Sequence, residues 1–145
     1  MLAHLPKDCE ILGTHPMFGP DSASETLYGA KIVLTKVRIE ESKYDNITAY
    51  LKQHGLRVLE ATAQEHDKQI AETLILTHFI GRGLIEFGAD HKSIDSKGHR
   101  RLMKILLTVQ NDAWQLFEDM NKFNPYAKET LDHFLKSLEL VKGKI

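Results

Sequence analysis

The sequence predicts an α+β chain that is mostly helical, with a small strand-containing part followed by an all-helical part. Residues 1–61 alternate between short extended patterns and one helical pattern, whereas residues 62–145 carry apolar residues at three- and four-residue spacing. The 145 residues, 42% hydrophobic and 27% charged, are enough for an ordinary soluble globular core. We therefore expect two domains, 1–61 and 62–145, with the boundary where the hydrophobic period changes.

The first part indicates strands on either side of one helix. Extended patterns cover residues 10–12, 30–37 and 56–59. Between the last two, the apolar residues that recur at helical spacing are Tyr44, Ile47 and Leu51. Gly55 follows where a helix usually ends. Because so few strands make a poor independent sheet, we expect an exposed strand edge that needs a partner.

The second part opens with a long helix. Thr62 is a good N-cap, and Glu65 three residues later completes a capping box. Apolar residues cover most of the circumference of this helix: Ile70, Leu74, Ile75, Phe79, Ile80 and Leu84. Such a helix must be buried on several sides. We hypothesise that a second copy of the chain supplies one of them, which gives a homodimer through the helical domain.

A narrow stripe of small or polar residues interrupts the apolar surface of this helix at positions 69, 73, 77 and 81. The stripe can face a ligand or make a close contact between helices, and the sequence leaves both open. A second helix is expected over residues 102–120, with one continuous apolar side. Asn124 as N-cap and Pro125 at the first helical position start the last helix.

Composition excludes several classes of function. The formal net charge of −1 gives no broad basic field for nucleic acid, and no apolar run approaches the length that crosses a bilayer. No signal peptide is indicated. The single cysteine, Cys9, cannot form an internal disulfide, so a cytoplasmic setting is expected.

Three histidines lie in informative surroundings. His15 stands between a glycine turn and a proline, directly after an apolar run, where an imidazole is poised for proton chemistry. The plain alternative is a polar turn residue. His66 lies near the start of the long helix and His78 further along it, and their spacing is not that of a helical zinc site, so we expect no metal. We interpret the remaining histidines as surface residues: His4, His54, His91, His99 and His133.

The stretch Gly-Thr-His-Pro-Met-Phe-Gly-Pro-Asp-Ser at 13–22 resembles the signature of the prephenate and arogenate dehydrogenases of tyrosine biosynthesis. The likeness continues through Glu-His-Asp at 65–67 and Leu-Thr-His-Phe-Ile-Gly-Arg at 76–82. Residues 94–98 and 116–124 look most like the plant and cyanobacterial branch. In this family, a cyclohexadienyl substrate passes a hydride to NAD or NADP and loses its ring carboxylate as carbon dioxide.

The resemblance implies a fold as well as a reaction. Residues 1–61 would be the last strands of a Rossmann-like dinucleotide-binding domain, and residues 62–145 a helical dimerisation and substrate domain. The sequence contains no G-x-G-x-x-G, so the resemblance covers about the second half of a complete enzyme. We therefore expect the isolated chain to be inactive unless a nucleotide-binding domain, in the same or a separate chain, brings the cofactor.

The resemblance also assigns roles to particular residues. His15 would accept the proton of the ring hydroxyl. Contacts to the substrate, prephenate or arogenate, would come from His66, Thr77, His78, Arg82, Arg100 and Arg101. Gly13, Thr14 and Pro16 would lie against the cofactor. Many bacterial relatives place a carboxylate-gripping arginine in the second helix, but this sequence has no arginine at 107–112. A non-enzymatic dimerisation or ligand-binding module, left after loss of the nucleotide-binding domain, is the alternative reading.

Overall fold

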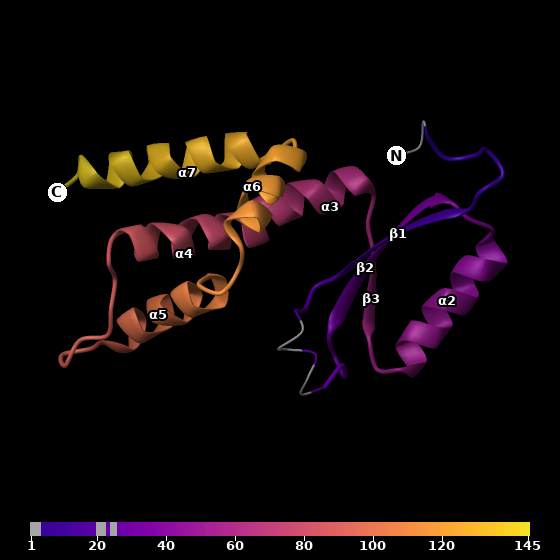
Figure 1. Cartoon of the computed structure of the whole chain (residues 1–145), viewed down its shortest axis with the longest axis horizontal. Coiled ribbons are helices and arrows are strands. Elements are labelled where there is room, and N and C mark those ends of the chain that lie inside the picture. The colour runs from indigo at the N-terminus through magenta and orange to yellow at the C-terminus, as the bar shows by residue number, and fades with distance from the viewer. Residues whose placement is uncertain (1–3, 20–22, 24–25) are drawn as a thin grey trace. The chain divides into compact units, whose positions relative to one another are not determined.

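The computed structural model describes residues 4–19, 23 and 26–145, and it separates into two compact units, residues 1–66 and 67–145 (Figure 1). The first unit contains β1 (Ile11–Pro16), β2 (Lys31–Arg38), α2 (Glu41–Gln53) and β3 (Arg57–Glu60), and it ends within α3 (Ala63–Ile70). The second unit is entirely helical in regular structure. The predicted fold class, a small strand-containing part followed by a helical part, is confirmed.

The three strands form one sheet in the order β1-β2-β3. β2 and β3 are parallel, as expected for strands joined by a helix, whereas β1 pairs with β2 in the antiparallel sense, which the sequence did not predict. The core of this unit consists of Ile32, Leu34 and Tyr44, so α2 packs on one face of the sheet. Gly55, two residues beyond α2, has φ of +83°, a left-handed conformation that favours glycine.

β1 is longer than the apolar run that predicted it. His15 pairs with Val33 and Pro16 with Ile32, so His15 is a strand residue and not a turn residue. The reason is that strand pairing depends on backbone hydrogen bonds, which residues 13–15 make as readily as the apolar residues before them, and Pro16, which has no N–H to donate, ends the strand. The strand holds the backbone of His15 in one position.

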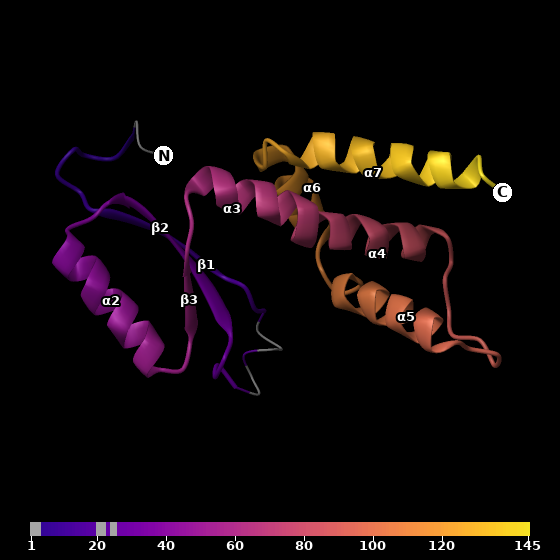
Figure 2. The same cartoon turned by 180° about the vertical axis from the view of Figure 1, so that it is seen from behind.

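The second unit is built around one long helix. α3 continues through a π-helical segment, η2 (Ala71–Ile75), into α4 (Leu76–Glu86) (Figure 2). The other helices are α5 (Lys97–Val109), α6 (Trp114–Phe123) and α7 (Ala127–Lys142). Ile70, Ile75 and Ala127 form a core with residues of α6 and α7, while α5 packs on α4 through Gly81. Helices of the same chain therefore cover two sides of the long helix. We expected a second subunit to cover one side of it.

The predicted helix over 102–120 is in fact two helices, because the chain turns between α5 and α6. Arg82 holds this turn from α4, since its Nη2 donates to the carbonyl oxygens of Asp112 (2.5 Å) and Ala113 (3.4 Å). A charged donor thus satisfies carbonyl oxygens of the segment that connects the two helices. The apolar side continues through both helices, so periodicity alone did not show the break.

The first predicted helix start is confirmed, whereas the second is wrong by two residues, because α7 has Tyr126 as its N-cap and begins at Ala127. The Thr62 N–H donates to the Glu65 carboxylate (2.9 Å), and the Glu65 N–H donates to Thr62 Oγ1 (3.1 Å), which is the capping box. The Tyr126 N–H donates to Asn124 Oδ1 (2.9 Å), and α7 begins at the next residue. In the described part of the chain, no helix is long and apolar enough to cross a membrane.

Thr62→Ala is expected to lower the free energy of unfolding by about 1 kcal/mol, because it leaves the first N–H groups of α3 without their cap. Thr62→Ser, which keeps the hydroxyl, should stay close to the parent. Hydrogen bonds from Thr62 lower the pKa of Glu65. The stabilisation that these hydrogen bonds give to the folded state is therefore present above the ordinary pKa of glutamate, and it is lost as the pH falls through the lowered pKa of Glu65. Urea unfolding at neutral and acidic pH checks both statements, and an unchanged gap between parent and Thr62→Ala in acid would contradict the second.

Candidate active site around two paired histidines

The structure brings together two of the predicted site residues, His15 and His66, which lie 51 positions apart. His15 Nδ1 is 2.7 Å from His66 Nε2, and the two rings meet edge to face with centroids 5.0 Å apart. β1 supplies His15, and the first turn of α3, fixed by the capping box, supplies His66. Both side chains are half-buried. A regular element therefore positions each ring.

The pair has two arrangements of its shared proton, and they differ in chemistry. When His15 donates from Nδ1 to His66, its Nε2 carries a free lone pair and can accept a proton. When His66 donates instead, His15 holds its own proton on Nε2 and can only donate. The distance of 2.7 Å fits both tautomers. Only the first makes His15 a base.

The electrostatic surroundings keep His15 neutral. Burial lowers its pKa below the usual value for histidine, and the neighbouring His66 lowers this pKa further. Both effects act because a positive charge on His15 would lose water and lie next to another imidazole. A neutral ring at physiological pH is the form that can take up a proton.

Gly13 lies in β1 opposite Thr35, which accounts for the absence of a side chain there. A Cβ on Gly13 would lie 3.2 Å from Thr35 Cβ, and the Thr35 hydroxyl donates to the Ala61 carbonyl (2.9 Å). The glycine thus permits a close approach of two strands. The cofactor contacts of Gly13, Thr14 and Pro16 stay a prediction, because their known neighbours are other strand residues.

In the second unit, His78 is buried on α4 with its Nε2 3.6 Å from a carboxylate oxygen of Asp112. Its Nδ1 has no hydrogen-bond partner among the described residues. Burial lowers the pKa of His78; Asp112 opposes this effect and Arg82 adds to it. The plain interpretation, a buried neutral histidine, fits these observations, and a substrate contact for His78 or for the half-buried Thr77 beside it stays a prediction.

The structure accounts for Arg82 within the fold. Arg82 holds the turn between α5 and α6, and its guanidinium also lies 5.4 Å from the centre of the Trp114 ring. Arg100, by contrast, is exposed near the start of α5, where its Nη1 donates to the Asp95 carbonyl (3.1 Å). Arg101 is exposed beside it. A role in gripping the substrate carboxylate stays a prediction for all three arginines.

The stripe at 69, 73, 77 and 81 is explained in part by contacts within the chain. The Thr73 hydroxyl donates to the Gln69 carbonyl (2.6 Å), which is a local bond within the helix. At Gly81, a Cβ would lie 2.5 Å from a methyl group of Val109. The second of the two open readings, a close contact between helices, is thus correct for Gly81.

Sequence reasoning missed a second cluster of histidines. The Asp95 carboxylate contacts Nδ1 of His91 (3.2 Å) and of His99 (2.6 Å). We had interpreted both histidines as surface residues without specific partners. The spacing of four residues on each side of Asp95 was the available signal. No group of three or more His, Cys, Asp or Glu side chains in the described ranges has the geometry to hold a metal ion.

Comparison with known proteins confirms the resemblance to the class of arogenate and prephenate dehydrogenases. The family model described as "TYRAAT1-like, C-terminal domain" matches residues 84–145. Within this class, Arogenate dehydrogenase 2, chloroplastic, of Arabidopsis thaliana is 32% identical over 99% of the chain. The chain spans 42% of the length of that relative.

Two solved structures share the fold. The crystal structure of Synechocystis arogenate dehydrogenase has a TM-score of 0.68 at 19% identity and covers 92% of this chain and 53% of its own. The prephenate dehydrogenase from A. aeolicus, in complex with hydroxyphenyl propionate and NAD+, has a TM-score of 0.68 at 18% identity, with coverages of 91% and 50%.

Proposed function

We propose that this chain forms the carboxyl-terminal, proton-accepting portion of an arogenate or prephenate dehydrogenase. The hydrogen bond between His15 and His66 carries the proposal, because it places a neutral, partly buried imidazole on a rigid strand with a second imidazole to orient it. The similarity to Arabidopsis arogenate dehydrogenase 2 over nearly the whole chain supports it. The reaction is the oxidative decarboxylation of a cyclohexadienyl alcohol.

In this proposal, His15 handles the proton of the reaction. Nε2 of His15 takes the proton from the ring hydroxyl while the carbon that bears this hydroxyl loses a hydride and becomes a ketone. Nδ1 of the resulting imidazolium donates to His66, which keeps the ring of His15 oriented. Loss of carbon dioxide leaves its bonding electrons in the ring and makes it aromatic, and His15 returns the proton to the phenolate oxygen. His66 is a positioning residue in this scheme.

The hydride acceptor is NAD or NADP. The solved A. aeolicus relative contains NAD+, whereas this sequence has no glycine-rich pyrophosphate motif. Gly13 packs against Thr35 of the neighbouring strand. We therefore propose that a dinucleotide-binding domain, joined to this chain or separate from it, brings the cofactor. β3 pairs only with β2 among the described strands, so its second edge is available for such a domain.

We also propose that the chain is a homodimer through its helical unit and acts in the cytoplasm. Support for the dimer comes from the second half of α7, where Leu135, Leu138, Leu140 and Val141 are all exposed. Apolar side chains gathered on one helix are typical of an interface. The name of the Arabidopsis relative places that protein in the chloroplast.

Prephenate or arogenate is expected to raise the Tm of the 145-residue chain, because a ligand that binds only the folded state stabilises it, by about 2.7 kcal/mol at a hundred times its Kd. Differential scanning calorimetry with each acid, and with citrate as a carboxylate control, measures this. His15→Asn should reduce the shift. No shift with either acid, or an equal shift with citrate, would contradict a substrate site and favour the non-enzymatic dimerisation module.

A further inference from the structure

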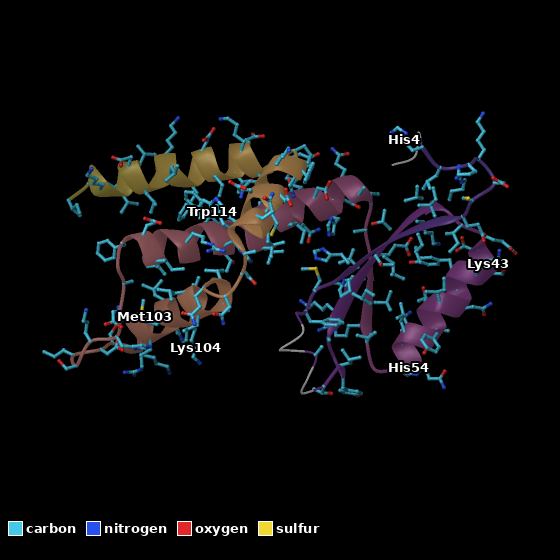
Figure 3. The ribbon with its side chains drawn as sticks, viewed as in Figure 1. His4, Lys43, His54, Met103, Lys104 and Trp114 are labelled. Carbon is cyan, nitrogen blue, oxygen red and sulfur yellow. The ribbon has the colours of Figure 1, made fainter. Side chains whose placement is uncertain are left out.

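The beginning of α5 carries a one-sided stripe of positive charge, which we call the basic stripe: Lys97, Arg100, Arg101 and Lys104. Their spacing of three, four and seven residues places them on one face of the helix. All four side chains are exposed, whereas Met103 between them is buried (Figure 3). The stripe therefore faces away from the helices against which α5 packs.

The first two cations of the basic stripe, Lys97 and Arg100, lie where helix electrostatics disfavours them. The first turn of a helix is its positive end, which attracts acidic residues and repels cations. α2, α3 and α7 follow this rule with Glu41, Glu65 and Glu129 in their first turns. α4, α5 and α6 have no acidic residue there, and of these three only α5 begins with a cation, Lys97. Cations three and four residues apart also repel one another.

Carboxylates in the described ranges compensate for only part of this repulsion. Lys97, Arg101 and Lys104 form no ion pair there, whereas Arg100 donates to the backbone carbonyl of Asp95 and interacts electrostatically with the Asp95 carboxylate. This carboxylate is 12% exposed and also contacts His91 and His99. The other three cations of the basic stripe are therefore available to an acidic partner from outside the unit.

The shape of the stripe selects an extended partner. Lys97 to Lys104 spans about 10 Å along the helix, on a convex exposed surface, whereas small dicarboxylates are held in concave sites. Exposed aliphatic residues flank the stripe, with Ile94 at 96% and Leu107 at 52% exposure. Residues 91–108 contain no Phe, Tyr or Trp, the side chains on which single-stranded nucleic acids stack. An acidic peptide with aliphatic side chains complements such a surface, because its carboxylates face the cations and its aliphatic side chains face Ile94 and Leu107.

We infer that the basic stripe on α5 is a docking surface for an acidic, aliphatic-containing segment of a partner protein. The test uses the full chain and a fluorescein-labelled peptide made of repeated Glu-Leu-Glu-Glu, followed by fluorescence anisotropy. Binding should weaken about tenfold between about 50 mM and about 200 mM salt, as expected of exposed charges. Lys97→Glu/Lys104→Glu should weaken it at least tenfold, while the matched charge change Lys52→Glu/Lys122→Glu, at exposed positions of α2 and α6, should leave the Kd within twofold.

A second variant separates binding from folding. Arg101→Glu places an acidic residue four positions after Lys97 and three before Lys104, and near the positive end of the helix, so it should raise the Tm while weakening peptide binding. Equal peptide binding by the two double variants would overturn the inference. Tighter binding of oligothymidylate, or of vesicles of phosphatidylserine and phosphatidylcholine, than of the peptide would overturn it too, since the partner would then be a nucleic acid or a membrane.

Discussion

His15→Asn is expected to lower kcat by about a hundredfold to ten-thousandfold, the usual contribution of a general base. The measurement requires a chimera in which residues 1–145 are joined to the amino-terminal portion of Arabidopsis arogenate dehydrogenase 2, with arogenate or prephenate and NAD or NADP. Asparagine preserves the size of the side chain but cannot take up the proton. His133→Asn, on the exposed side of α7, is the matched control and should keep the parent rate. Turnover by His15→Asn at the parent rate would show that His15 is not the base.

The pH dependence of the same chimera tests the partnership with His66. Because burial and His66 lower the pKa of His15, kcat/KM should hold at pH values somewhat below the ordinary pKa of histidine and fall as the pH drops through the lowered value. His66→Ala removes one cause of the lowering, so the acid limb should move to higher pH. A purely structural role for His66 would reduce the rate without moving this limb.

Gly81→Ala is expected to destabilise the helical unit by about 1–3 kcal/mol, although alanine normally favours a helix over glycine. The added Cβ would lie 2.5 Å from a Val109 methyl and 3.2 Å from the Ile105 carbonyl oxygen, and Val109 is fully buried. Because the carbonyl belongs to the backbone of α5, the two helices must separate. Denaturant unfolding followed by circular dichroism measures the loss.

Gly83→Ala offers a control on the same helix. A Cβ there meets nothing within 4 Å, so this substitution should raise the stability by up to about 1 kcal/mol through helix propensity alone. The two substitutions therefore have opposite expected signs. In the double variant Gly81→Ala/Val109→Ala, the smaller side chain relieves the clash, and the loss should be less than the sum of the single losses. Equal gains from both glycine substitutions would show that α4 and α5 do not pack as closely as described.

Several local features were visible in the sequence because residues close together in the chain create them. The capping box at Thr62 and Glu65 involves positions three apart, and the end of α2 at Gly55 depends on the conformation of a single residue. The long helix followed from its period of apolar residues. The period of apolar residues did not show the break between α5 and α6, because the apolar side continues through both helices. The apolar run also did not show the full length of β1, because strand pairing extends beyond it.

The residues of the candidate site were predicted one by one, but their partnerships were not. The sequence indicated that His15 and His66 have chemical interest, and the resemblance to a family of dehydrogenases gave His15 a role. Only the structure shows the two rings within hydrogen-bond distance. It also shows a structural role for Arg82, which holds the turn at Asp112, 30 positions away, while its contact to a substrate stays a prediction.

The amino-acid sequence by itself determined the class of fold, the start of the long helix and the family resemblance, and it indicated His15 as a candidate for proton transfer. The tertiary structure alone decided which strand holds His15, which imidazole lies within hydrogen-bond distance of it, why Gly81 has no side chain, and that Lys97, Arg101 and Lys104 of α5 form no ion pair in the described chain. The physical reason is that propensities and caps act over a few neighbouring residues. Hydrogen bonds, close packing and uncompensated charge depend on the distances between segments that only folding brings together.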